Sequence, residues 1–252
     1  MSSEHLLVRA IGYIATVLQG DPAVLGRWLF LRRYLTPGPL RTMDAGSGSG
    51  AMAIYAAKRG HKVTGVSLSQ RDNQVAAERL KILGLSNAEF VTGDLRELEK
   101  VAAGWPPFDQ VICFEVIEHI KDDRKLVRDL ANVLKPGGVL LLTTPYKHYN
   151  PLPGDGISEV EDGSHVRWGY TFKEMREMLD AAGLEVRVEE YITGYWSQLV
   201  MRVQRTLVMK GVPGKIAWLL TLPLRLLQAL DPLAARIKNY PALSIGVVAV
   251  KR

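Results

Sequence analysis

The chain has 252 residues, 47% of them hydrophobic and 23% charged, a composition that excludes a largely disordered chain and a membrane-spanning bundle. Basic residues exceed acidic ones by six, and the segment 194–240 alone holds seven basic residues against one acid. The rest of the chain is balanced, which excludes a basic surface spread over the molecule for nucleic acid. A single cysteine, Cys113, cannot form an internal disulfide, so we expect a cytoplasmic protein.

The first half of the chain alternates short β-like runs with helical periodicity. Residues 1–36 show a mildly apolar, amphipathic pattern that predicts a helical cap. The alternation that follows is typical of a parallel sheet covered by helices. The pattern predicts strands at 40–45, 62–66, 89–92, 109–114 and 139–143, and helices at 51–59, 71–83 and 122–134.

The second half begins with a long loop at 145–169 that is rich in proline, glycine and acids, a length typical of a lid or binding loop. Thr171 and Glu174 form a capping box, which predicts a helix at 171–182. Strands are predicted at 184–192 and 243–250. We therefore expect one α/β domain with a cap at 1–36, a core at 40–193, a helical insert at 194–240 and a final strand within 241–252.

A glycine-rich turn follows the first strand, with the sequence Asp44-Ala45-Gly46-Ser47-Gly48-Ser49-Gly50. Glycines at alternate positions let a ligand approach the backbone, and the next helix offers free N–H groups. A nucleotide-type ligand is implied. The same stretch fits the dinucleotide fingerprint, so a nicotinamide-dependent oxidoreductase is an alternative. Asp44 argues against it, because a carboxylate here would repel a pyrophosphate but attract the ammonium and sulfonium groups of S-adenosylmethionine (SAM).

Further motifs follow the glycine turn in a fixed order: Gly93-Asp94-Leu95 after the third strand, Glu115-Val116-Ile117-Glu118-His119 after the fourth, and Pro136-Gly137-Gly138 before the fifth. Together they resemble the motifs of class I SAM-dependent methyltransferases, over about residues 40–190 and the final strand. The resemblance implies a seven-stranded Rossmann-like sheet, mostly parallel with the last strand antiparallel, and SAM as the cofactor. It also implies an enzyme that transfers a methyl group.

The resemblance assigns cofactor contacts residue by residue. Asp94 would accept a hydrogen bond from the adenine amino group, and the Leu95 N–H would meet the ring. Phe114 and Glu115 would lie beside the methionine end of SAM, although core packing is an equal alternative for Phe114. The chain departs from the family at the end of the second strand, where Ser67-Leu68 stands in place of an acid on the ribose hydroxyls. A similar neutral variant occurs in relatives of cyclopropane fatty acid synthase.

The cluster Glu115, Glu118 and His119, with His165 in the lid, points to chemistry on a hydroxyl group. In ubiquinone-pathway O-methyltransferases and small-RNA 2′-O-methyltransferases, a similar E-x-x-E-H with a distal histidine binds a metal that activates a hydroxyl. Without a metal, a histidine would serve as general base, because imidazole titrates near neutral pH. We expect His119 and His165 to be catalytic and leave the metal open.

The acceptor is expected to be small and hydrophobic. Aromatic side chains gather in sequence around the lid and the start of the insert: Tyr146, Tyr149, Trp168, Tyr170, Tyr195 and Trp196. The leucine-rich run of the insert would form a roof over such an acceptor, a dimer face or a peripheral contact with a membrane. A SAM-dependent lipid-modifying enzyme is therefore the alternative function. A nucleic-acid methyltransferase is not expected, since the fourth strand lacks the Asn-Pro-Pro-Tyr motif of base-methylating enzymes.

Overall fold

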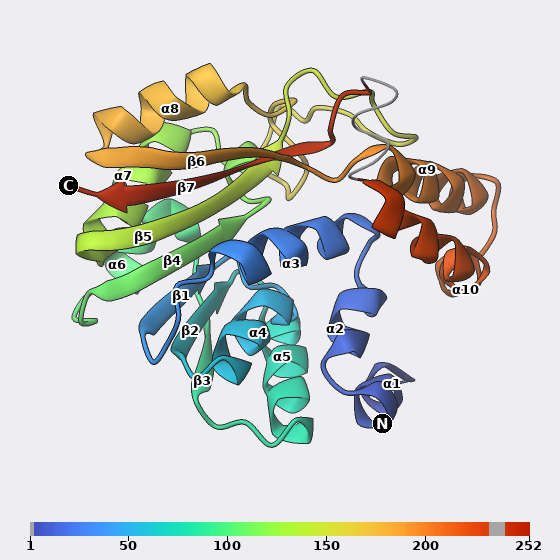
Figure 1. Cartoon of the computed structure of the whole chain (residues 1–252), viewed down its shortest axis with the longest axis horizontal. Coiled ribbons are helices and arrows are strands. Elements are labelled where there is room, and N and C mark those ends of the chain that lie inside the picture. Colours follow the sequence, from blue (N-terminus) through green and yellow to red (C-terminus); the bar gives the residue numbers. More distant parts are fainter. Residues whose placement is uncertain (1–2, 232–239) are drawn as a thin grey trace.

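A computed structural model describes residues 3–231 and 240–252 (Figure 1). Residues 232–239 of the predicted insert, including Arg236 and Lys238, lie outside the described residues, as do residues 1–2. Seven strands form a single twisted sheet with helices on both faces, and a group of helices packs beside one end of it. None of the described helices is long and apolar enough to span a bilayer.

The sheet has the strand order β3-β2-β1-β4-β5-β7-β6. Strands β1 to β5 pair in parallel, whereas β7 runs antiparallel to both of its neighbours. This confirms the predicted Rossmann-like sheet with an antiparallel last strand. The strands are β1 (Arg41–Ala45), β2 (Lys62–Ser67), β3 (Ala88–Thr92), β4 (Phe108–Phe114), β5 (Leu134–Pro145), β6 (Leu184–Ile192) and β7 (Ser244–Lys251).

The Pro-Gly-Gly stretch does not separate a helix from the fifth strand as the sequence predicts. Helix α7 (Asp123–Val133) ends and β5 begins at once, because Leu134 already pairs with Phe108 of β4. Gly137 takes a φ of +75°, and the ladder between β4 and β5 shifts register beside it. The three residues therefore form an irregularity within the strand.

Helices cover the two faces of the sheet and close a hydrophobic core on each. One core lies under α3 (Ala23–Tyr34), α4 (Ala51–Lys58) and α5 (Gln70–Ile82). The other lies under α7, α8 (Phe172–Ala181) and the short α6 (Leu98–Val101), a helix of a single turn that has too few residues to show periodicity in the sequence. The carboxyl ends of β1, β2 and β4 thus meet at one edge, where the motif residues lie.

The insert packs against the N-terminal helices. It contains α9 (Tyr195–Met209), α10 (Gly214–Thr221) and the 3₁₀ helix η3 (Pro223–Leu230). It lies beside α2 (Ile14–Gln19), which follows α1 (Ser3–Ile11), at the right of Figure 1. The Trp218 indole donates a hydrogen bond to the Leu18 carbonyl (2.8 Å), and the Arg225 guanidinium donates to the carbonyls of Leu18 (2.9 Å) and Gly20 (3.0 Å). Carbonyls at a helix C-terminus lack intrahelical donors, so these contacts join the two segments.

Candidate functional site

The glycine turn after β1 leaves open space beside its backbone. Gly46, Gly48 and Gly50 have φ values of +88°, +47° and +83°, which favour glycine. A Cβ at Gly46 would lie 2.3 Å from a methyl carbon of Val116, whereas a Cβ at Gly48 would meet nothing within 4 Å. The N–H groups of Gly46 and Ser47 both donate to the Val66 carbonyl at 2.9 Å, which ties the turn to β2. The middle of the turn therefore borders room for a ligand.

Asp44 lies buried at the end of β1 with only 3% of its surface exposed. Its Oδ2 has no hydrogen-bond partner among the described residues. Burial raises the pKa of Asp44 to about 7, against a smaller lowering by the backbone N–H of Ala53. A buried carboxylate oxygen without a partner is unfavourable, and a cationic group would satisfy it. The arrangement suits the ammonium group of SAM.

The residues expected around adenosine follow β2 and β3. Ser67 is buried and accepts a hydrogen bond from the Ser69 N–H (3.2 Å), while the Leu68 side chain is 69% exposed. Asp94 caps a 3₁₀ turn, η1 (Leu95–Glu97), by accepting from the Arg96 N–H (2.9 Å), and both of its carboxylate oxygens accept from the Arg96 guanidinium. Arg96 lowers the pKa of Asp94. An adenine amino group would therefore share this carboxylate with Arg96, a residue that the motif does not indicate.

Leu95 and Phe114 pack into the two cores. Leu95 is buried under α6 and α7, and the Phe114 ring meets that of Phe30 in an edge-on contact, with the centroids 5.9 Å apart. The Phe114 side chain thus packs in the core, which is the alternative to a contact with the methionine end of SAM. This side chain packs between α3 and the sheet, and the contact with the glycine turn is made by the side chain of Val116, which follows β4.

Glu115 adopts a left-handed backbone conformation, with a φ of +54°, immediately after β4. Such a conformation in a residue other than glycine is unfavourable and is found at functional sites. The partly buried carboxylate accepts hydrogen bonds from the hydroxyls of Thr143 (3.0 Å) and Ser244 (3.3 Å). Burial raises the pKa of Glu115, and Arg27 opposes this effect. The side chain is directed toward β5 and β7 and not toward the glycine turn.

The structure brings Glu118, His119 and His165 together, and we call them the central cluster. One potential metal-ligand atom of each lies within 4.8 Å of the others. The two imidazole rings meet edge-on with centroids 4.7 Å apart, and Glu118 Oε1 lies 3.8 Å from His119 Nε2. Glu118 is fully buried and accepts from the Thr144 hydroxyl (3.2 Å) through its other oxygen.

The central cluster has polar atoms that no described residue satisfies, namely Glu118 Oε1 and His119 Nδ1. Burial raises the pKa of Glu118 well above its usual value, and the nearby Glu115 adds to this. Burial also lowers the pKa of His165, as does the neighbouring His119. The His165 imidazole is therefore neutral at neutral pH and has a free electron pair for a proton or a cation.

Hydrogen bonds from the lid to backbone carbonyls hold the segment around His165 in place. The Val166 N–H donates to the Glu118 carbonyl (2.9 Å), and the Arg167 guanidinium donates to the carbonyls of residues 120–121 (2.8 and 2.9 Å). On the other side, the Ser158 N–H donates to the His165 carbonyl (2.8 Å). These hydrogen bonds thus attach the lid to the segment that follows β4.

The central cluster lines a cavity of about 230 Å³, the central cavity. Glu115 lines it too, and so do residues that the sequence analysis did not single out for it: Asp21 and Arg27 of the N-terminal segment, Leu152 and Asp155 of the lid, Met201 and Arg205 of α9, and Leu243. Of the six aromatic residues expected around the acceptor, Tyr149 lines this cavity. The lining of this cavity includes no leucine of residues 216–230, and the insert contributes Met201 and Arg205 of α9 to it.

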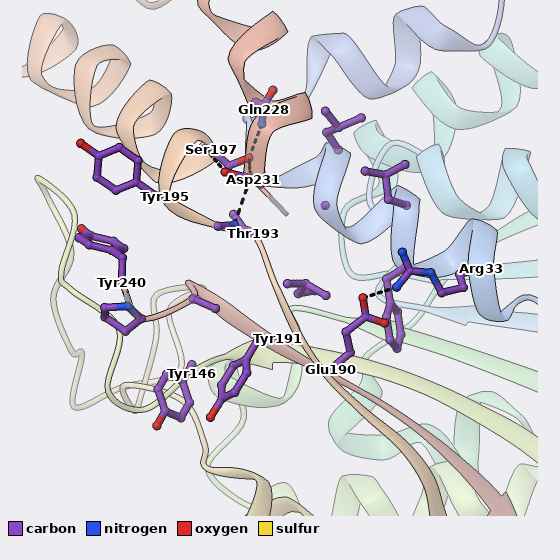
Figure 2. Close-up of a pocket in the computed structure, with 18 residues that line it drawn as sticks. Arg33, Tyr146, Glu190, Tyr191, Thr193, Tyr195, Ser197, Gln228, Asp231 and Tyr240 are labelled. Carbon is purple, nitrogen blue, oxygen red and sulfur yellow. Dashed lines mark hydrogen bonds and ion pairs between the residues drawn. The ribbon is translucent and has the colours of Figure 1, made fainter. Parts of the chain in front are cut away.

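A second cavity of about 600 Å³ lies between α3, the end of β6 and the start of α9 (Figure 2). Tyrosines and the Arg33–Glu190 ion pair line it, as Figure 2 shows, and two of the expected aromatic residues, Tyr146 and Tyr195, are among them. It shares no lining residue with the central cavity, and it contains no member of the central cluster. The central cavity is therefore the candidate active site.

Known proteins of similar sequence are methyltransferases. Residues 24–189 match the family model of a methyltransferase domain. The chain is 31% identical over 153 residues to a ubiquinone biosynthesis O-methyltransferase of Idiomarina loihiensis, covering 58% of this chain and 61% of that one. It is 34% identical over 113 residues to the enzyme of the same name from Xanthomonas campestris, covering 44% and 45%. The chain thus spans about half the length of these relatives.

Solved structures share the fold at lower identity. The phosphoethanolamine N-methyltransferase 2 of Haemonchus contortus, solved with SAM, has a TM-score of 0.61 at 19% identity, covering all of this chain and 60% of that one. The [4+2]-cyclase SpnF has a TM-score of 0.58 at 20% identity, covering 88% and 78%. The fold alone therefore does not fix the reaction. The sequence match does fix the family, and the chain belongs to the class I SAM-dependent methyltransferases.

Proposed function

We propose that the chain transfers the methyl group of SAM to a hydroxyl oxygen of a small, hydrophobic acceptor. The observation that carries the proposal is the central cluster, in which Glu118 is buried and both histidines are partly buried; it adjoins the glycine turn through Val116. The sulfonium already activates the methyl group, so the protein has to align the reactants and take up a proton. A neutral histidine in a buried cavity fits that need. The names of the two curated relatives support oxygen as the methylated atom.

The cofactor would bind across the carboxyl ends of β1, β2 and β4. Asp44 would pair with the ammonium group of SAM, and Gly46, Ser47, Gly48 and Gly50 would let the nucleoside approach the backbone. Ser67 and Leu68 would meet the ribose and Asp94 and Leu95 the adenine, while Phe114 and Glu115 would border the methionine end through their backbone. The open space beside Gly48 supports this placement.

The protein would work as one domain. The central cavity receives Asp21 and Arg27 from the cap at 1–36, its acids and histidines from the core at 40–193, Met201 and Arg205 from the insert, and Leu243 from the final segment. A cavity lined by all four parts is complete only when they fold together.

The central cluster also fits a divalent cation. Catalytic zinc sites use three protein ligands and leave one position open, and carboxylate plus imidazole is a typical set. Within the described part of the chain, Glu118 Oε1 and His119 Nδ1 have no hydrogen-bond partner, whereas the Glu115 oxygens accept from Thr143 and Ser244. Glu118, His119 and His165 would thus be the ligands, and Glu115 would lie behind them. A bound cation would lower the pKa of an acceptor hydroxyl.

Release of S-adenosylhomocysteine (SAH) in the presence of catechol tests the proposal. We expect His165→Gln to lower the rate at least a hundred-fold and to leave SAH binding unchanged. His148→Gln is the matched control, because His148 lies exposed in the lid and lines neither cavity described above. Dialysis against EDTA followed by addition of Mg²⁺ or Zn²⁺ separates the two roles: a cation-dependent rate assigns the cluster to a metal, and an unchanged rate assigns it to proton uptake. Equal rates for both histidine variants would overturn the proposal.

A lipid acceptor at a membrane surface is the second candidate. Eight of the seventeen large apolar side chains that are exposed among the described residues fall within residues 208–230. The exposed Lys210 and Lys215 lie among them, and the sequence has no acid between residues 195 and 230. An exposed apolar and basic surface suits an anionic bilayer. Flotation with phosphatidylglycerol vesicles tests this, and a protein that stays at the bottom of the gradient excludes it.

A further inference from the structure

A third cavity, of about 660 Å³, lies between the lid and one side of α9, and we call it the lid pocket. Its volume is that of a typical small-molecule site. Its rim carries three exposed apolar side chains, Ile157 of the lid at 41%, and Val208 and Met209 of α9 at 46% and 68%. Exposed apolar side chains around a cavity mark a place where apolar ligands bind.

The lid pocket and the central cavity have a common wall. Asp155, His165 and Arg205 line both of them. Arg205 forms an ion pair with Asp155, which also accepts hydrogen bonds from the Tyr149 hydroxyl (2.6 Å) and the Leu152 N–H (2.9 Å). The wall is thus held from both the lid and α9. A molecule in the lid pocket would lie against His165, which belongs to the central cluster.

The two cavities and the glycine turn follow one another in space. The turn touches Val116, the next residues form the central cluster, and His165 of that cluster borders the lid pocket. The central cavity, at about 230 Å³, has room for a reacting ring and little more. An acceptor with a larger apolar part has to place that part elsewhere, and the lid pocket is the neighbouring space with an apolar rim.

We propose that the lid pocket binds the apolar body of the acceptor while its hydroxyl group reaches the central cluster beside His165, which lines both cavities. This inference rests on the proposed function, since it places one acceptor across two cavities. Calorimetric titration of the SAH-loaded protein with 4-octylcatechol tests it without any need for turnover. The variant is Met209→Glu, which puts a charge on the rim at a largely exposed position. The matched control is Leu226→Glu, at an 81% exposed leucine of η3 that does not line the pocket.

We expect Met209→Glu to weaken 4-octylcatechol binding at least ten-fold, while Leu226→Glu binds it like the unchanged protein. Val208→Trp, which fills the pocket, should weaken binding similarly. Equal affinity in all proteins, no binding at all, or an equal loss in the Leu226 variant would overturn the inference. If binding changes as expected but the unchanged protein methylates neither catechol nor 4-octylcatechol, the proposed reaction fails and the lid pocket stands as a binding site.

Discussion

Replacing Asp44 by asparagine should have opposite effects on the stability of the fold and on the affinity for the cofactor. Asp44 is buried and has no charged partner among the residues that the structure describes, and burial raises its pKa from the usual 3.8 to about 7. The folded state therefore holds a proton that the unfolded state gives up above pH 4. The free energy of unfolding falls as the pH rises from about 4 to 7, and the full penalty is present above pH 7.

The size of this destabilisation follows from the pKa shift of Asp44. One pKa unit corresponds to 1.36 kcal/mol, so the shift amounts to about 4 kcal/mol at pH 8. Asparagine carries no charge and still offers an oxygen to the Ala53 N–H. We therefore expect Asp44→Asn to raise the melting temperature of the ligand-free protein by about 10 °C at pH 8. The same change removes a charge-assisted contact to the ammonium group of SAM, which corresponds to about a 10- to 100-fold loss of affinity.

Two assays test these opposite effects. Differential scanning calorimetry of the ligand-free protein measures the melting temperature, and isothermal titration with SAH measures the affinity. In the unchanged protein the affinity for SAM should rise between pH 6 and 8 as Asp44 loses its proton, more steeply than in the variant, in which only the ligand titrates. A variant that melts at a lower temperature, or that binds SAH as tightly as the unchanged protein, refutes the assignment of Asp44.

Three further substitutions probe the rest of the site. Gly50→Ala should lower the free energy of unfolding by about 2 kcal/mol, because Gly50 has a φ of +83° and a Cβ there would lie 2.7 Å from Ala76. An unchanged midpoint in urea unfolding would show that alanine fits at this position without strain. Ser67→Asp should keep or tighten SAM binding up to about ten-fold, and complete loss in a titration would show that Ser67 does not face the ribose. Glu118→Gln should bind SAH normally and lose methyl transfer at least about a hundred-fold, and a fully active variant would remove Glu118 from the chemistry.

The sheet and the glycine turn could be predicted because both are encoded by short-range patterns. Strand runs and helix periodicity give the element order, and the spacing of Asp44 and its glycines fixes a turn that few other conformations allow. The Pro-Gly-Gly stretch was predicted wrongly, because the pairing of Leu134 with Phe108 of another strand overrides the local turn preference.

The site depends more on long-range contacts, and less of it could be predicted. His165 was singled out for its neighbours in sequence, but its contact with His119 is created by the Val166 N–H and the Arg167 side chain, which bind backbone carbonyls after β4. Arg27, on a helix of the cap, shows no local pattern that distinguishes it from a surface arginine. The Asp155–Arg205 pair joins residues fifty positions apart, and nothing in either segment indicates the other.

Following the methyl carbon from SAM to its product shows whether the chain methylates a hydroxyl group. SAM labelled with ¹³C in its methyl group would be incubated with the protein and 4-octylcatechol, and the product examined by NMR. We expect a labelled methoxy carbon on the ring, formed by the unchanged protein and the His148→Gln control and absent with His165→Gln. A label found in a cyclopropane ring of added phospholipid, or a methoxy product formed equally well without His165, would contradict it.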